Sequence, residues 1–176
     1  RHLAVQANVS SRHRWQTVSS GLAEALHTLT DDHWELTFGQ GRNPSMEEVQ
    51  ARLFAGMDRP VDAIALFSGG LDSYAGAACW LEEHPAKQLG LLSLSTSTVV
   101  TKVQRDLAAR LKERFTGRVM WLSVPLSLIK APDIERSQRT RGFLYTAVAA
   151  AVARWAKASE VLVFENGYGS LNPRLV

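Results

Sequence analysis

Hydrophobic residues along the chain recur at two spacings, one typical of strands and one typical of helices. The succession of these two patterns changes near Pro60. After Pro60, short runs that are almost continuously apolar alternate with amphipathic segments. Continuously apolar runs of strand length are typical of parallel strands that are buried on both faces. The runs predict strands near residues 61–67, 89–94, 118–124 and 161–165, as parallel neighbours in one sheet. Strands that alternate with helices predict an α/β domain with helices on both faces of the sheet.

The amphipathic segments between these runs predict helices. Apolar residues at i, i+3, i+4 and i+7 form one face of a helix, and that face packs on the sheet. The segment Arg141 to Lys157 is so rich in Ala, Val, Leu and Phe that we expect it to be largely buried. The two earlier helices are marked by Tyr74, Ala77, Ala78 and Leu81, and by Val100, Val103, Leu107, Leu111 and Phe115.

The segment before Pro60 predicts a small extension. "HWELTF" alternates apolar and polar residues, as a half-buried strand does. Ser45 and Glu48 form a capping box ahead of a helix. We therefore divide the chain into an N-terminal α+β extension, 1–59, and a main domain, 60–176, and we expect the Trp and Met residues of the extension in its core. Its two helices are marked by Trp15, Val18, Leu22, Leu26 and Leu29, over about 12–29, and by Met46, Val49, Leu53 and Met57.

Composition indicates a globular, cytoplasmic protein. Of the 176 residues, 45% are hydrophobic and 21% are charged, which is enough for a buried core. No apolar run approaches the ~20 residues that cross a bilayer, so we expect no membrane partner. The single cysteine, Cys79, excludes an internal disulfide, fits a reducing cytoplasm and is expected as a small core residue. The net charge of +3 mildly favours anionic ligands. What precedes Arg1 and follows Val176 stays open.

The stretch "IALFSGGLDS", which ends at Ser73, places small and polar residues directly after a buried strand. Gly69 and Gly70 let an anion approach the backbone closely, and the loop leads into a helix whose first N–H groups attract negative charge. Ser68 and Ser73 add hydroxyl donors, and Asp72 suits a magnesium ion that bridges phosphates. An ordinary turn, with Asp72 or Ser73 capping the helix, is the alternative. A pyrophosphate group with its metal explains the whole stretch best.

"SGGLDS" resembles the SGGxDS signature of the PP-loop ATP pyrophosphatases, which include GMP synthetase, NAD synthetase and 7-cyano-7-deazaguanine synthase. The resemblance implies an adenine-nucleotide alpha hydrolase fold for the main domain. It also implies that ATP is split between its α and β phosphates and that a substrate oxygen is adenylated. Asp72 and Ser73 are then catalytic residues, with Asp72 at the magnesium ion. The implied contacts to ATP come from Ser68, Gly69, Gly70, Leu71, Asp72 and Ser73.

A second region indicates which branch of the PP-loop family the chain resembles. The segment "ERSQRTRGFLYTAVAAAVARWAKASEVLVFENGYGSLNP" is similar to the part of the 7-cyano-7-deazaguanine synthases (QueC) in which an arginine opens a buried helix and a strand leads into an Asn-containing substrate loop. "QRTRG" and "ENG…SLN" resemble more closely the QatC proteins of the bacterial Qat anti-phage system. The resemblance implies a catalytic role for Arg141. The implied substrate-binding residues are Arg139, Arg141, Glu165, Asn166, Gly167, Ser170 and Asn172.

Simpler explanations for these residues stay open. Arg139 and Arg141 stand near a helix start, where cations are unfavourable, so either an anionic ligand or an ion pair with Glu135 would offset that cost. Glu165 and Asn166 suit recognition of a purine-like edge, yet polar residues are also ordinary in loops.

The resemblance implies an ATP-dependent ligase that adenylates a carboxylated 7-deazaguanine-like substrate, releases pyrophosphate and AMP, and forms an amide or a nitrile. ATP and Mg²⁺ are the expected cofactors, and a protein or nucleic acid from the same operon is a candidate acceptor. A PP-loop enzyme that modifies tRNA, and a nucleotide-sensing subunit without turnover, remain alternatives. The synthase has a cysteine zinc site near its C-terminus that this chain lacks, so the zinc ligands lie beyond Val176 or this branch has none.

Overall fold

The computed structural model describes residues 1–41, 60–95, 97–125 and 139–165. Contacts divide the chain into two compact units. The capping box at Ser45 and the helix predicted after it lie outside the described residues. The first unit comprises Arg1–Val49 and Ser137–Gly142, and the second comprises Gln50–Arg136 and Phe143–Val176.

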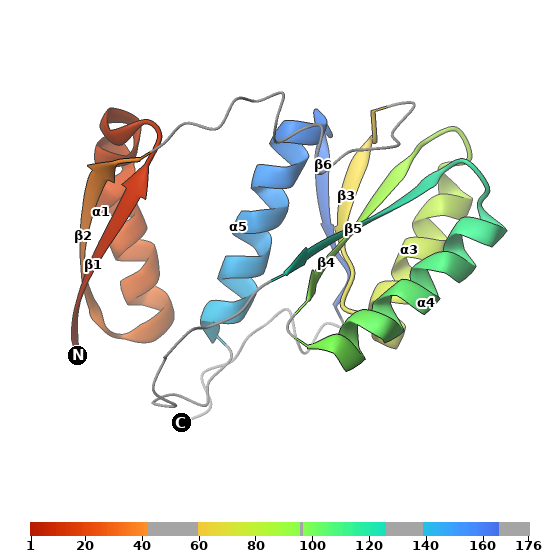
Figure 1. Cartoon of the computed structure of the whole chain (residues 1–176), viewed down its shortest axis with the longest axis horizontal. Helices are drawn as coiled ribbons and strands as arrows, with labels where there is room; N and C mark the ends of the chain where they lie inside the picture. The colour runs from red at the N-terminus through yellow and green to blue at the C-terminus, as the bar shows by residue number, and fades with distance from the viewer. Residues whose placement is uncertain (42–59, 96, 126–138, 166–176) are drawn as a thin grey trace. The chain divides into compact units, whose positions relative to one another are not determined.

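A four-stranded parallel sheet forms the centre of the second unit (Figure 1). Its strand order is β5-β4-β3-β6, and every neighbouring pair is parallel. This confirms the predicted strands and their parallel pairing, and it makes the unit an α/β, Rossmann-like arrangement. The strands are β3 (Ala63–Leu66), β4 (Leu89–Ser95), β5 (Val119–Pro125) and β6 (Glu160–Val163).

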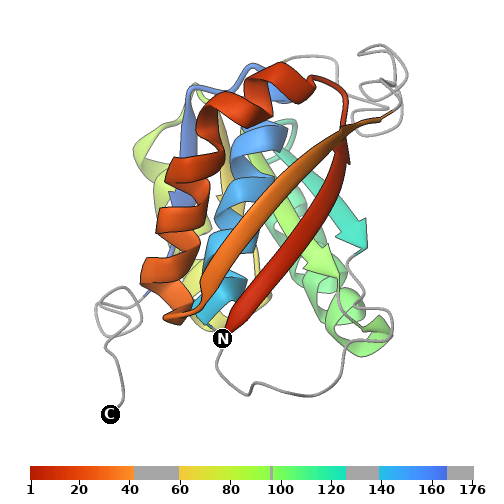
Figure 2. The ribbon, with the colours of Figure 1, turned by 90° about the vertical axis from the view of Figure 1, so that its left-hand side faces the viewer.

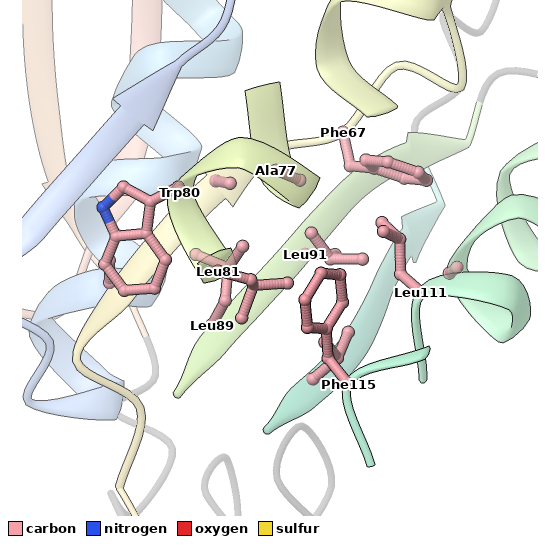
Figure 3. Close-up of a cluster of buried hydrophobic side chains, with 12 residues drawn as sticks. Phe67, Ala77, Trp80, Leu81, Leu89, Leu91, Leu111 and Phe115 are labelled. Carbon is pink, nitrogen blue, oxygen red and sulfur yellow. The ribbon is translucent and has the colours of Figure 1, made fainter. Parts of the chain in front are cut away.

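Helices cover both faces of this sheet, as the apolar strands predicted. α3 (Leu71–Glu83) and α4 (Thr98–Arg114) lie on one face, and α5 (Arg139–Ala156) lies on the other (Figure 1). Successive side chains of a strand point to opposite faces, so each strand contributes to two separate cores. The core under α3 and α4 includes Phe67, Ala77, Trp80, Leu81, Leu89, Leu91, Leu111 and Phe115 (Figure 3), and the core under α5 includes Ile64, Leu92, Ala149, Val152 and Ala153.

The expectation that α5 is largely buried is wrong. Only a stripe at i, i+3, i+4 and i+7 is buried, and Leu144 on the same helix is 40% exposed. The reason is that a helix lying on a sheet needs only one apolar face, whatever the composition of its other faces. The buried stripe consists of Ala149, Val152, Ala153 and Ala156.

Cys79 is exposed, which corrects its expected place in the core. The buried face of α3 is formed by Ser73, Ala77, Trp80 and Leu81. Cys79 is two residues beyond Ala77, about 200° around a helix of 3.6 residues per turn, so it falls on the opposite face.

The first unit is a parallel pair of strands joined by a helix. β1 (His2–Val9) pairs with β2 (His33–Gln40) over their whole length, and α1 (Arg12–Thr30) connects them and lies along the pair (Figure 2). α1 and β2 confirm the predicted helix and strand. β1 was not predicted, although "HLAVQANV" places apolar residues at every second position, which is the same strand signal that "HWELTF" carries.

The tryptophans of the first unit are not core residues, contrary to expectation. Trp15 is 41% exposed and packs against Phe38, and no residue of α1 is buried. Trp34 is half-buried, and its indole Nε1 donates to Thr30 Oγ1 at 2.9 Å. One helix on two strands encloses no interior, so large side chains remain partly in contact with solvent.

Within the described ranges, no helix combines the length and the apolar character that crossing a bilayer requires.

Gly76 on α3 allows the segment after β6 to approach the helix. A Cβ atom at this position would collide with the ring of Phe164. We expect Gly76→Ala to lower the free energy of unfolding by about 1–3 kcal/mol, because the ring has to move in a packed region. Urea denaturation measures this change.

Gly142→Ala is the matched control, because a Cβ atom at Gly142 meets open space on α5. Alanine has the higher helix propensity, so this substitution should raise the free energy of unfolding by up to about 1 kcal/mol. Equal effects of the two substitutions would contradict the proposed packing of Phe164 on Gly76.

Candidate functional site

The segment "SGGLDS" connects β3 to α3 at the carboxyl end of an interior strand. From β3 the chain proceeds outward to β4 and β5 and then returns to β6 on the other side of β3. The strand order therefore reverses between β3 and β6. In open parallel sheets, ligands bind outside the carboxyl ends of the strands at such a reversal.

The backbone of this loop has the conformation that a close ligand approach requires. Gly69 has a φ of +83°, which residues with a side chain rarely adopt. Gly70 is the N-cap of α3 and, because it has no side chain, it makes no side-chain cap hydrogen bond. A left-handed glycine and a glycine at the start of a helix are both backbone features that suit an anion.

Three hydrogen bonds close a circuit within the loop, which we name the serine circuit. The Gly70 N–H donates to Ser68 Oγ at 3.2 Å, and the Ser73 hydroxyl donates to the Gly70 carbonyl at 2.9 Å. The two serine hydroxyls lie 3.1 Å apart. Since the Ser73 proton is already donated, the proton between the hydroxyls comes from Ser68.

The serine circuit changes the roles expected of the loop residues. Ser73 is only 3% exposed, and its hydroxyl reaches a phosphate only if the circuit opens. Asp72, in contrast, is exposed in the first turn of α3, where its carboxylate can face a metal ion. Leu71 is 81% exposed, so it can contribute backbone to an anion site while its side chain stays in solvent.

Gln104 of α4 holds the other side of the loop, and the sequence analysis did not identify it. Its Nε2 donates to the Ser68 carbonyl at 3.2 Å and, more weakly, to the Phe67 carbonyl at 3.5 Å. Ser93 Oγ also donates to the Phe67 carbonyl, at 2.9 Å, and accepts from Trp121 Nε1. The sequence does contain a signal for this residue: Gln104 is polar and stands at helical spacing from Ala108 and Leu111, with which it shares the buried face of α4.

A second group of hydroxyls lies at the carboxyl ends of β4 and β5. Ser95 and Ser123 lie on these neighbouring strands two positions out of register, and their Oγ atoms are 2.6 Å apart. Ser97 caps α4 by accepting from the Val100 N–H at 3.3 Å. The sequence signal was the run "SLSTST", which the sequence analysis treated only as the end of a strand and the start of a helix.

Only some of the predicted substrate-binding residues lie in the part of the chain that the structure describes. Glu165 is exposed and lies at the same edge of the sheet as Ser68, because β3 and β6 pair in register up to Leu66 and Val163. Asn166, Gly167, Ser170 and Asn172 lie outside the described residues.

The two predicted arginines lie in the first turn of α5. Arg141 is exposed, and both Arg139 and Arg141 belong to the first unit. The sequence also predicts that Arg141 and Asn166 reach the carboxyl ends of the strands, where Gly69 and Gly70 lie, and this stays a prediction.

A resident metal cluster is not found in the described part of the chain. There, no group of three or more His, Cys, Asp or Glu side chains could hold a metal ion. The exposed carboxylate of Asp72 fits a magnesium ion that takes most of its oxygen ligands from phosphates and water, which is the usual pattern for magnesium with nucleotides.

Comparison with known proteins adds no family to this description, because no family model, curated protein or solved structure matches the chain.

The loop conformation predicts unequal effects of two neighbouring substitutions. Gly69→Ala should lower the free energy of unfolding by about 1–3 kcal/mol, because alanine is strained at positive φ and its Cβ would lie 3.1 Å from Gln104 Cγ. Urea denaturation of both variants tests this expectation.

Gly70→Ala is the control, because Gly70 has a φ of −85° and a Cβ there would make an ordinary contact with Ser68 Oγ at 3.4 Å. The cost should stay within about 1 kcal/mol, the difference between glycine and alanine at an N-cap. A larger loss in Gly70→Ala than in Gly69→Ala would show that the loop follows another path.

Proposed function

We propose that the protein is an ATP-dependent ligase of the PP-loop ATP pyrophosphatase type, with the adenine-nucleotide alpha hydrolase-like fold of that group. One observation carries the proposal: "SGGLDS" forms a loop with a left-handed Gly69, at the carboxyl end of an interior parallel strand, and leads into a helix whose N-cap is a glycine. A pyrophosphate site explains this arrangement better than an ordinary turn does, because a turn requires neither a helix start next to the glycines nor a reversal of strand order.

In the proposed reaction, a substrate carboxylate oxygen attacks the α-phosphorus of ATP. The bond between the α-phosphorus and the bridging oxygen breaks, and pyrophosphate leaves. An amine then attacks the acyl carbon, AMP leaves, and an amide forms after loss of a proton. If the amine is ammonia, a second ATP could adenylate the oxygen of the primary amide with release of pyrophosphate, and departure of AMP with loss of both N–H protons would give a nitrile.

The loop residues would stabilise the departing pyrophosphate. Backbone N–H groups at the start of α3 supply positive potential without needing to move. Asp72 would hold the magnesium ion, which supplies positive charge to the phosphate oxygens when bound. Opening of the serine circuit would release the Gly70 N–H and the Ser68 and Ser73 hydroxyls toward those oxygens.

The second substrate in this proposal is a carboxylated 7-deazaguanine-like molecule. The support is the resemblance of the segment around Arg141 and Asn166 to deazaguanine synthases and QatC proteins, together with the place of Glu165 at the same sheet edge as the loop. A role in bacterial anti-phage defence, with an acceptor protein or nucleic acid from the same operon, belongs to the same proposal.

Asp72→Asn tests the nucleotide chemistry. The substitution removes the negative charge that would hold magnesium, so we expect AMP formation from ATP to fall about a hundredfold or more, with little change in the urea midpoint. The assay contains ATP, Mg²⁺ and 7-carboxy-7-deazaguanine, and it measures AMP, pyrophosphate and the modified product.

Glu83→Gln is the matched control, because it removes the same charge from an exposed position at the other end of α3. It should retain the parent rate. Binding of ATP by the parent protein without any AMP formation would instead support a nucleotide-sensing subunit, and activity that depends on tRNA would support a tRNA-modifying enzyme.

Asn166→Ala and Arg141→Ala test the second substrate. A lost hydrogen bond from a polar group to the base should weaken deazaguanine binding in Asn166→Ala by about tenfold to a hundredfold, while the affinity for an ATP analogue stays nearly unchanged. Arg141→Ala should slow adenylation itself. Calorimetric titration of each variant with each ligand distinguishes the two, and parent-like affinity of Asn166→Ala for both ligands would refute base recognition.

A further inference from the structure

Gln104 is a buried polar side chain on the face of α4 that packs toward the loop after β3. It is 2% exposed, and its neighbours on this face are Ala108 and Leu111. A Cβ atom built at Gly69 would lie 3.1 Å from Gln104 Cγ, so the loop backbone passes directly over this side chain.

The orientation of the Gln104 carboxamide follows from its partners. Both groups that it faces, the carbonyls of Phe67 and Ser68, are acceptors, so only the amide nitrogen can be turned toward them. The other end of the carboxamide, Oε1, is buried, and the described residues give it no hydrogen-bond partner. A buried acceptor without a partner costs about 1–3 kcal/mol, which a methionine or leucine at this position would avoid.

Holding these two carbonyls also sets the direction of the amides that follow them. In a planar trans peptide, the carbonyl and the N–H of the next residue point in opposite directions. With the Ser68 carbonyl turned toward α4, the Gly69 N–H points away from α4. The Phe67 carbonyl is held by Ser93 and Gln104 together, so the Ser68 N–H is directed away from them in the same manner.

We propose that Gln104 is a positioning residue for the anion site: by anchoring the Ser68 carbonyl to α4, it turns the Gly69 N–H toward the pyrophosphate group of ATP. This inference rests on the proposed function. Gln104 itself does not touch the ligand. Its effect passes through the Ser68–Gly69 peptide, and the absence of a Gly69 side chain is what allows α4 to come close enough.

Gln104→Met and Ser93→Ala form the test pair. Methionine has a similar volume but donates no hydrogen bond, so it releases the Ser68 carbonyl. Ser93→Ala removes the hydrogen bond to the Phe67 carbonyl and the one that Ser93 Oγ accepts from Trp121 Nε1, and it leaves the Ser68 carbonyl anchored to Gln104. We expect magnesium pyrophosphate to bind about tenfold more weakly to Gln104→Met and within twofold of the parent to Ser93→Ala, by calorimetry. Both variants lose a buried hydrogen bond, so a purely structural role would predict similar changes in affinity.

Amide hydrogen exchange at Gly69, measured by NMR, gives a second readout. Magnesium pyrophosphate should slow this exchange in the parent and in Ser93→Ala, because the ligand would accept a hydrogen bond from the Gly69 N–H. At the same ligand occupancy, it should slow the exchange less in Gln104→Met.

The outcomes separate this inference from the proposed function. If the parent binds magnesium pyrophosphate and Gln104→Met binds it equally well, the positioning role is refuted and the proposed function stands. If the parent binds neither pyrophosphate nor an ATP analogue, the proposed function is refuted. The positioning role, which rests on that function, is then refuted with it. If pyrophosphate binds to the parent and leaves the Gly69 exchange unchanged, the positioning role is refuted and the proposed function stands.

Discussion

The close approach of the loop backbone to α4 is the constraint on which the site depends. Gly69 has no side chain and a φ of +83°, so the backbone passes close to Gln104, where an added Cβ atom would lie 3.1 Å from Gln104 Cγ. The buried face of α4 differs from the predicted one. Gln104 occupies the inner position, and Val100 and Val103, which the periodicity placed on the inner face, are exposed. The loop after β3 and the inner face of α4 are therefore packed together, although they lie far apart along the chain.

The sheet and its helices were predictable because their signals are local. A four- to eight-residue apolar run, or an apolar stripe at helical spacing, is present in the sequence whatever the rest of the chain does. The extent to which individual side chains are buried could not be predicted from such local signals. The exposure of Cys79, of Trp15 and of much of α5 depends on how many elements cover a given face, and composition does not contain that information.

The candidate site was predictable where one continuous motif forms it, and not where distant segments meet. "SGGLDS" was found from the sequence, and the structure places it at the end of an interior strand. Gln104, Ser93 and Trp121 were missed, because their connection to the loop arises from three different elements. The inward orientation of Ser73 was also missed, since it depends on a hydrogen bond across one helical turn.

The serine circuit bears on selectivity. Because Ser68, Gly70 and Ser73 satisfy one another, the loop has little to gain from a weakly interacting anion. An incoming group has to replace several internal hydrogen bonds at once, so only an anion with several strongly accepting oxygens offers a favourable exchange. A halide has no such set of oxygens. In the proposed function, a loop that is closed on itself in this way would stay closed among small monovalent ions and would rearrange for a polyphosphate.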